Sequence, residues 1–335
     1  MINIRDIAAE CKLSVATVSK ALNGYKDVSE ETRTRVLEIS RKLGYIPNAS
    51  ARALKTNRTF NIGILFTDDQ NNGLTHYHFS HVLNSFKNEI ERSGYNITFI
   101  NRRFGQEKVS LLQNCKFRGI EGVIIVCVDE NDPELLELTK SDIPFISVDH
   151  VYPGSPTILS DNRNDIKKLI RYIYSLGHRK IAYIHGNPNN VTYERVAGYK
   201  EAHEELGMPI REEYMKESYY TNAYTTRRAT EQILALSDRP TCILTPDDLS
   251  AFGCIEGIKA AGLSVPDDIS VAGYDGILFS QIMTPKLTTM KQDTAKIGEH
   301  AARLLIYNIE NPDKPDISPV VIKSELIKGQ SVGPI

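Results

Sequence analysis

Three aspartates directly follow apolar runs with the length of a buried strand, and one arginine opens a helix after another such run: Asp149, Asp247, Asp275 and Arg195. Carboxylates and a guanidinium around a cleft can bind the paired hydroxyl groups of a sugar through charge-assisted hydrogen bonds. The carboxylates could in principle also carry out acid–base chemistry. Alternatively, an aspartate at the end of a strand, such as Asp149 or Asp248, only caps a helix or forms a turn.

Aromatic side chains can complete a sugar site, since a ring face packs against the apolar side of a sugar ring. The candidates are Phe79, Tyr193 and Tyr220. Phe79 lies in the unusual segment Leu74-Thr-His-Tyr-His-Phe-Ser-His81, whose three histidines have a spacing that metal ligands could use. A zinc site would need a fourth ligand and ordered hydrogen-bond partners for the histidines. We therefore expect no metal, and interpret the histidines as ligand contacts or surface residues.

The sequence lacks the motifs of several large enzyme classes. No GxGxxG follows a strand, and there is no GxxxxGK[ST] loop and no GxSxG elbow. The N-terminal part of the chain is basic and helical, and such a segment has no role in a small hydrolase. The sequence therefore predicts a binding protein rather than an enzyme, with no cofactor.

The candidate site must be positioned by the long stretch 61–335, in which strand and helix patterns alternate. Such alternation predicts an α/β fold of parallel sheets with right-handed crossovers. It restarts at Asp165, so we expect two similar lobes. Open sheets of this kind bind ligands at the carboxyl ends of their strands, where the aspartates lie. The predicted strands are 62–66, 97–100, 122–128, 145–148, 181–184, 242–244, 269–272 and 320–322.

Charge is unevenly distributed along the 335 residues, a length that suits two or three domains. Residues 1–60 hold eleven Lys/Arg and six Asp/Glu, a net charge of +5, whereas the remainder holds 29 basic and 36 acidic residues, a net of −7. A basic head on an acidic body indicates a polyanionic partner for the head. The five scattered cysteines contain no CxxC and, with no signal peptide or membrane-spanning apolar run, indicate a reduced cytoplasmic protein.

The head has the pattern of three helices, capped by Asn3, Ser14 and Ser29. The break between the first two, Lys12-Leu13, suits a helix-turn-helix. In that motif the N-terminal residues of the second helix face base edges in the major groove. Here Val15 and Ala16 could contact thymine methyls and Lys20 could donate to guanine, with Thr17 beside them. The alternative is a plain helical bundle with a basic surface.

A short helix is predicted after the head, where Pro47 ends the third helix and Asn48 can cap the stretch that runs to Asn57. Its one large apolar side chain, Leu54, is flanked by Arg52 and Lys55. A helix this short is marginal in water, so it should form only when something holds it. A lone leucine among basic residues suits a wedge in the DNA minor groove. The alternative is a linker with one exposed leucine.

Four segments together resemble a known family: Ile4-Arg-Asp-Ile-Ala8, Ser14-Val-Ala-Thr-Val-Ser-Lys-Ala-Leu-Asn23, Val28-Ser-Glu-Glu-Thr-Arg33 and Leu43-Gly-Tyr-Ile-Pro-Asn-Ala-Ser-Ala-Arg-Ala-Leu54. By these motifs the chain is identified as a member of the lactose/galactose repressor family of bacterial transcription regulators. The resemblance continues to the C-terminus. It implies that Val15, Ala16 and Lys20 read bases and that Leu54 enters the minor groove.

This chain departs from the family pattern at three positions. Lys20 stands where arginine is frequent, which loses a bidentate contact. Lys12 stands where many members have glycine in the turn, and a lysine held at positive φ would cost on the order of 1 kcal/mol. Asp247 stands where sugar-responsive members often carry asparagine. The resemblance therefore gives the class of protein but neither the operator sequence nor the effector.

The resemblance implies that the body has two lobes of the periplasmic sugar-binding type, with the effector between them. The chain would cross between the lobes near 159–162, 290–293 and 320–323. The implied domains are a helix-turn-helix head (1–46), a hinge helix (47–60) and an effector-binding and dimerisation body (61–335), with lobes of about 61–159 plus 291–320 and about 160–290 plus 321–335. His78 and Phe79 stand in place of a small aromatic pair of the family.

Together these observations predict a homodimeric regulator, a repressor of a carbohydrate operon, that binds pseudo-palindromic operator DNA and responds to a sugar or sugar phosphate. The expected DNA contacts are Ser14, Val15, Ala16, Thr17, Lys20, Asn23, Tyr45, Asn48, Arg52, Leu54 and Lys55. The expected effector contacts are His78, Phe79, Asp149, Tyr193, Arg195, Tyr220, Asp247 and Asp275. The alternatives are a family member gated by a protein co-regulator and a sugar-binding protein without operator function.

Overall fold

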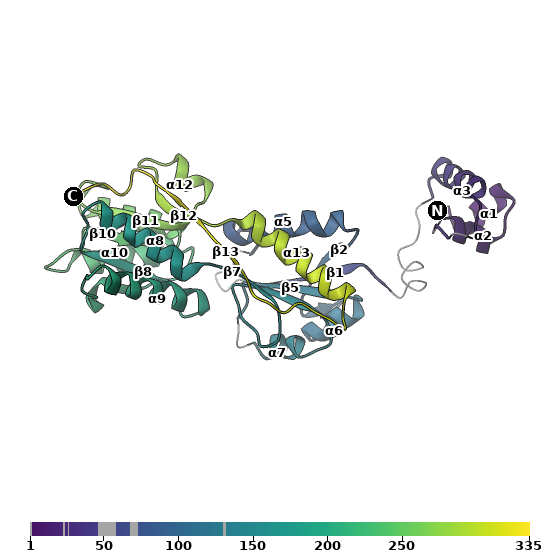
Figure 1. Ribbon diagram of the computed structural model, residues 1–335, viewed down its shortest axis with the longest axis horizontal. Coiled ribbons are helices and arrows are strands. Elements are labelled where there is room, and N and C mark those ends of the chain that lie inside the picture. Colours follow the sequence, from purple (N-terminus) through teal and green to yellow (C-terminus); the bar gives the residue numbers. More distant parts are fainter. Residues whose placement is uncertain (1, 23, 26, 46–57, 68–72, 130–131) are drawn as a thin grey trace. The chain divides into compact units, whose positions relative to one another are not determined.

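The computed structural model describes residues 2–22, 24–25, 27–45, 58–67, 73–129 and 132–335. The chain divides into two compact units, Met1–Phe60 and Asn61–Ile335, whose elements are labelled in Figure 1. The predicted hinge residues Asn48, Arg52, Leu54 and Lys55 lie outside the described residues, as does Asn23.

The first unit contains the three predicted helices, α1 (Ile4–Cys11), α2 (Val15–Leu22) and α3 (Glu30–Leu43). Local caps set their starts: the Asn3 side chain accepts from the backbone N–H of Arg5, and the Ser29 hydroxyl accepts from that of Thr32. The helices enclose a small apolar core made of Ile7, Ala8, Cys11, Val18, Ala21, Val28 and Val36. Three helices around one core confirm the predicted helix-turn-helix head.

The turn between α1 and α2 depends on Lys12, which adopts a left-handed conformation with φ 51° and ψ 43°. Ser14 then caps α2, because its hydroxyl accepts from the Thr17 backbone N–H at 3.0 Å. This geometry confirms that lysine here occupies a backbone region that glycine would enter without strain. The turn is kept short, as a helix-turn-helix requires.

The second unit begins with a six-stranded sheet in the order β13-β7-β6-β5-β1-β2. The strands are β1 (Asn61–Phe66), β2 (Asn96–Phe99), β5 (Gly122–Val126), β6 (Phe145–Val148), β7 (Thr157–Ser160) and β13 (Val320–Ile322), and all pair in parallel. Figure 1 shows α5 (Tyr77–Arg92) and α13 (Thr294–Glu310) on one face, and α6 (Leu111–Phe117) and α7 (Pro133–Thr139) on the other. A small hairpin, β3 (Arg103–Phe104) and β4 (Glu107–Lys108), precedes α6.

A second six-stranded sheet follows in the order β14-β12-β11-β10-β8-β9. Its strands are β8 (Ile181–His185), β9 (Met215–Glu217), β10 (Cys242–Leu244), β11 (Ser270–Asp275), β12 (Thr288–Lys291) and β14 (Glu325–Ile327). Alternate residues of β8 face opposite ways: Ile181 and Tyr183 pack with α8 (Asn162–Ser175) and α9 (Asn190–Glu205), whereas Ala182 and Ile184 pack with α10 (Ala223–Leu234) and α11 (Asp248–Ala260). Helices therefore cover both faces, as the sequence predicts.

The chain passes between the two sheets three times. It leaves the first sheet after Ser160 to form α8, returns after Lys291 to form α13, and leaves again between β13 and β14. Hydrogen bonds fasten the passages together: the Asp161 backbone N–H donates to the Ile322 carbonyl at 3.0 Å, and Ser160 pairs with Gln292. The third passage follows residue 322, within the predicted range 320–323, but Val321 and Ile322 belong to the first sheet and not, as the predicted lobe boundary has it, to the second lobe.

The structure corrects several details of the sequence-based description. Strands β7, β9, β12 and β14, and helix α12 (Leu278–Ile282), are absent from the predicted pattern. The second sheet is not wholly parallel, because β14 runs antiparallel to β12. Helix α5 begins at Tyr77, which places His78 in its first turn.

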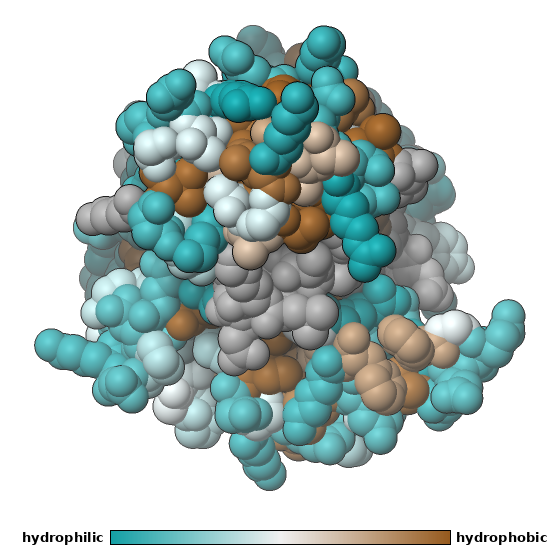
Figure 2. Space-filling model, turned by 90° about the vertical axis from the view of Figure 1, so that its right-hand side faces the viewer, coloured by the Kyte–Doolittle hydropathy of each residue, from teal (hydrophilic) through white to brown (hydrophobic). Residues whose placement is uncertain are grey.

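No helix among the described residues combines the length and the apolar character that a membrane crossing needs. Figure 2 shows hydrophobic side chains, in brown, scattered among hydrophilic ones on the face that it draws. Isolated apolar residues of this kind are normal on protein surfaces. A tighter group occurs on and beside α12, where Leu278, Phe279 and Ile282 are 61%, 56% and 66% exposed.

Candidate functional site

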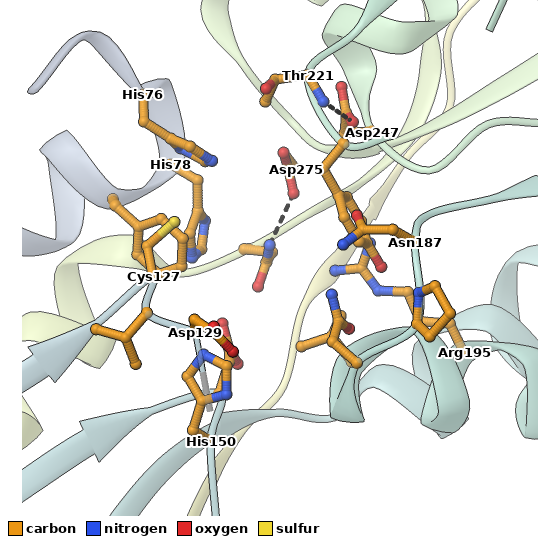
Figure 3. A pocket seen from close by; sticks show the side chains of 18 of the residues that line it. His76, His78, Cys127, Asp129, His150, Asn187, Arg195, Thr221, Asp247 and Asp275 are labelled. Carbon is orange, nitrogen blue, oxygen red and sulfur yellow. Dashed lines mark hydrogen bonds between the residues drawn. The ribbon is translucent and has the colours of Figure 1, made fainter. Parts of the chain in front are cut away.

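A cavity of about 330 Å³ lies between the two lobes of the body. Figure 3 shows His76, His78 and Cys127 on one side of it, and Arg195, Asp247 and Asp275 on the other. All eight side chains predicted to contact an effector line this cavity: His78, Phe79, Asp149, Tyr193, Arg195, Tyr220, Asp247 and Asp275. The volume is at the small end of the range of about 300–1,000 Å³ that is usual for ligand sites.

Arg195 lies in the second turn of α9, which begins at Asn190, so the prediction that it opens this helix is wrong. It is 4% exposed and is held by neutral partners. Its Nε donates to Asn162 Oδ1 at 2.7 Å, its Nη1 donates to the Pro246 carbonyl at 2.8 Å, and its guanidinium lies 3.5 Å from the centre of the Tyr274 ring. Burial opposes its charge, but the surrounding groups, led by Tyr274 and Tyr220, raise the pKa of Arg195 above its usual value. A permanent cation is therefore fixed in the wall of the second lobe.

Asp247 has the two roles that the sequence left as alternatives. Its carboxylate caps α11 by accepting from the Ser250 backbone N–H and hydroxyl, each at 2.8 Å, and it also accepts from the Thr221 backbone N–H at 2.7 Å. Burial raises the pKa of Asp247, although these hydrogen bonds act against the rise. Asp247 thus ties the Thr221 loop to α11 while it lines the cavity.

Asp275 and Asp248 lie close by but differ in their access to the cavity. Asp275 lines it, and its Oδ1 accepts from Gln292 Nε2 at 2.8 Å. Burial and the charge of Asp247 raise the pKa of Asp275 well above its usual value. Asp248 is fully buried between Thr289 Oγ1, at 2.6 Å, and the Ile277 backbone N–H, at 2.9 Å. Asp248 is therefore structural, but it links α11 to β12 and to the segment at Ile277 rather than capping a helix, since the cap of α11 is Asp247.

Asp149 is the candidate ligand contact of the first lobe. It is 8% exposed, and its Oδ1 is buried with no hydrogen-bond partner. Burial raises the pKa of Asp149, while the charge of Arg195 lowers it. A buried acceptor without a partner costs about 1–3 kcal/mol, more when it is charged. A donor on a bound molecule would remove that cost.

The backbone is strained around the cavity. Four of its lining residues that are not glycine have positive φ: Cys127 (49°), Asp149 (65°), Thr221 (54°) and Asp275 (107°). Each such residue costs on the order of 1–3 kcal/mol, and these conformations concentrate at functional sites. The strain directs side chains at the strand ends into one space.

The histidine-rich segment does not form a shared metal site. His78 is 5% exposed and lines the cavity, whereas His81 is exposed and its Nδ1 lies 2.8 Å from the Tyr77 carbonyl oxygen. His76 precedes α5, and the centre of its ring lies 4.8 Å from that of Phe79, with the two planes tilted by 52°. Within the described residues, no group of three or more His, Cys, Asp or Glu side chains is arranged to bind a metal ion.

The predicted aromatic platforms take different positions. Tyr193 is 64% exposed at the edge of the cavity. Tyr220 is anchored, because its hydroxyl lies 2.8 Å from Thr192 Oγ1 and its ring fills the space that a side chain at residue 186 would occupy. Gly186 is therefore required for the Tyr220 ring to lie where it does.

Several lining residues escape prediction from the sequence: Thr67, His76, Cys127, Val128, Asp129, His150, Asn187, Pro188, Asn189, Val191, Thr221 and Gln292. Thr67 and Asp129 carry a usable signal, since each directly follows a predicted strand, and His150 and Asn187 lie two and three residues beyond one. Gln292 carries none, because it reaches the cavity only where the second passage between the sheets is placed beside Asp275.

The head presents part of the predicted DNA-contacting set. Ser14, Val15, Ala16 and Lys20 are exposed, and Val15 is 42% exposed despite being apolar. Lys20 forms an ion pair with Asp27. Tyr45, also predicted as a DNA contact, packs against the core of the head. Thr17 is half-buried and hydrogen-bonds to the Ser14 hydroxyl.

Comparison with known proteins gives two family matches. Residues 3–48 match the model described as bacterial regulatory proteins, lacI family, and residues 170–332 match a periplasmic binding protein-like domain. The chain is 31% identical to catabolite control protein A of Priestia megaterium, over 91% of each chain. It is also 31% identical to the HTH-type transcriptional repressor PurR of Mannheimia succiniciproducens, over 99% of each chain.

Solved structures agree with these matches. The lac repressor dimer bound to operator and the anti-inducer ONPF is 25% identical, with a TM-score of 0.81 over 99% of each chain. A LacI family regulator from Enterococcus faecium with bound ribose is also 25% identical, with a TM-score of 0.69 over 82% of this chain and 99% of that one. From its helix-turn-helix head through both lobes of its body, the chain belongs to the lacI family of bacterial regulatory proteins.

Proposed function

We propose that this member of the lacI family is a homodimeric repressor that binds a pseudo-palindromic operator and is gated by a small sugar-like effector in the interlobe cavity. The head supplies the exposed residues of α2 for the major groove. We assign the contacts in the minor groove to the hinge residues that the sequence identifies, with Leu54 as the wedge. In this role the chain is a DNA-binding transcription regulator and not an enzyme.

The cavity between the lobes is the observation that carries the proposal. It combines carboxylates, a fixed cation and aromatic side chains, which is the composition that binds the polar and apolar faces of a sugar ring. The buried Asp149 Oδ1 accepts no hydrogen bond from the protein, so a hydroxyl group of a ligand can donate to it. The structural relative with bound ribose supports the same class of ligand.

Gating follows from the position of this cavity. A ligand that touches both lobes binds the closed arrangement better, and it can shift the equilibrium only by that difference in affinity. Among the described residues, direct hydrogen bonds join the lobes from Leu278 N–H to the Tyr77 hydroxyl at 3.0 Å and from Asn190 Nδ2 to the Asp149 carbonyl at 3.5 Å. We infer that a bound effector adds to these contacts and so changes the spacing of the two heads in a dimer.

Dimerisation is supported by the apolar surface on and beside α12. Leu278, Phe279 and Ile282 are each more than half exposed, and a group of this kind is typical of a subunit interface. A two-fold symmetric dimer would present two heads to two half-sites, which accounts for a pseudo-palindromic operator.

Two alternatives make different predictions. A protein co-regulator would act from the outer surface and leave the cavity empty, whereas a sugar-binding protein without operator function would not bind specific DNA at all. The test is to select duplexes from a random pool with the full-length protein, and then to titrate the selected operator with and without neutral and anionic sugars. We expect nanomolar binding that one sugar alters by at least tenfold. Failure to select any sequence would refute the operator function.

A further inference from the structure

His78 has a chemical environment that restricts which effector the cavity can hold. It is 5% exposed, it lines the cavity from the first turn of α5, and both of its ring nitrogens are buried without a hydrogen-bond partner. Burial, together with the nearby charges of His76 and Arg195, lowers the pKa of His78 to about 3. The ring is therefore neutral at physiological pH, with one N–H donor and one acceptor nitrogen.

Carboxyl groups outnumber permanent cations in the wall of the cavity. Four aspartates line it, Asp129, Asp149, Asp247 and Asp275, against the single guanidinium of Arg195. Two of the five N–H donors of Arg195 are already bonded to Asn162 and Pro246. A phosphate or carboxylate on a ligand would meet a neutral imidazole and several carboxyl groups, with only part of one guanidinium to compensate it.

We propose that the effector is an uncharged polyol, with one hydroxyl donating to Asp149 and another exchanging hydrogen bonds with His78, and that anionic sugars are excluded. A hydroxyl group both donates and accepts, so it complements the paired donor and acceptor of a neutral imidazole. It also donates to the unpartnered Asp149 Oδ1 without adding charge. His78 is thus a residue that determines specificity, and this inference rests on the proposed function.

The experiment is a calorimetric titration of the full-length protein with matched sugars. The probes are ribose and ribose 5-phosphate, glucose, glucose 6-phosphate and glucuronate, and cellobiose, each also added to the operator complex. We expect at least one neutral sugar to bind, and its matched anion to bind at least about tenfold more weakly. An anion that binds more tightly than its neutral parent overturns the inference, as does a set in which no neutral sugar binds below 10 mM.

Variants of α5 isolate the role of His78. His78→Phe keeps a ring of similar size and removes both polar atoms, so the affinity for the neutral sugar should fall about tenfold. His78→Gln restores a donor and an acceptor and should recover part of the loss. His81→Phe, three residues along the same helix but outside the cavity, is the matched control and should bind as wild type. Equal affinity of His78→Phe and wild type would remove His78 from the site.

The same measurements separate this inference from the proposed function. If an anionic sugar binds tightly and releases or strengthens the operator complex, effector gating holds and the neutral-ligand inference fails. If a neutral sugar binds through His78 but leaves operator affinity unchanged, the inference holds and sugar gating fails. The two results cannot be confused, because one is read from sugar affinity and the other from operator affinity.

Discussion

Replacing Arg195 by alanine tests whether this side chain stabilises the body as well as lining the cavity. Its Nε and Nη1 bridge Asn162, at the start of α8, to the Pro246 carbonyl before α11, and its planar group covers the Tyr274 ring. Arg195→Ala would leave the Asn162 and Pro246 oxygens without these donors. The variant therefore removes a cross-link between three segments of the second lobe.

The size of the effect can be worked from these contacts. Hydrogen bonds to a charged group are each worth about 1.5–3 kcal/mol, so two of them contribute about 3–6 kcal/mol. Removing the buried cation also removes the cost of its desolvation, which offsets part of that sum. We expect a net loss of about 3 kcal/mol in the free energy of unfolding. At about 2–4 °C per kcal/mol for a large domain, Tm should fall by about 6–12 °C.

Thermal unfolding followed by circular dichroism measures this change, and the exposed ion pair of Arg211 with Asp238 offers a control. Arg211→Ala should leave Tm nearly unchanged, since exposed ion pairs contribute little. At 20 °C Arg195→Ala should still bind the operator, because the head is a separate compact unit, but should no longer respond to the effector. A Tm equal to that of wild type would refute the stabilising role, and an intact effector response would remove Arg195 from the site.

Three further predictions concern the head, the hinge and pH. Asp27→Asn should release Lys20 from its ion pair and raise the affinity for the operator several-fold at low salt. Lys20→Ala should reduce the free energy of operator binding by about 1–3 kcal/mol and relax the base preference at one operator position. Fluorescence anisotropy with a panel of operator variants measures both effects. Leu54→Ala should reduce DNA bending in circular-permutation gel shifts while salt-sensitive binding survives; an unchanged bend would make Leu54 a linker residue. His78 becomes protonated near pH 6.5 in the unfolded chain but only near pH 3 in the folded protein. Between pH 7.5 and pH 5 the free energy of unfolding of wild type should therefore fall by about 2 kcal/mol more than that of His78→Phe. Urea unfolding measures both, and parallel pH profiles would contradict the prediction.

The sequence is most informative where structure is local. The three helices of the head follow from capping residues such as Asn3 and Ser29, and the buried strands β1 and β5 follow from continuous apolar runs. Strand β12 is missed because it reads Thr-Thr-Met-Lys. Its polar residues are buried only because distant groups satisfy them: Asp248 accepts from Thr289 Oγ1, and the Thr288 N–H donates to Ser331.

Among the residues that line the cavity, those at strand ends are predictable from the sequence and those on loops are not. Asp149 and Asp275 are predictable because an aspartate at the end of a parallel strand must lie at the ligand-binding edge of the sheet. Gln292 and Thr221 reach the cavity through loops and passages whose positions depend on packing between segments far apart in the chain. Asp247 shows the limit of a motif, since the same carboxylate caps α11 and faces the cavity.

The three passages between the lobes restrict how one lobe can move relative to the other. Two lobes joined by a single segment could twist, slide and bend relative to each other, whereas three segments side by side allow mainly the bending motion. Asp161 is bonded to Ile322, and Ser160 is paired with Gln292, so the passages move together. Any ligand that touches both lobes therefore acts on essentially one coordinate. The whole difference in its affinity for the two arrangements then acts on the bend between the lobes.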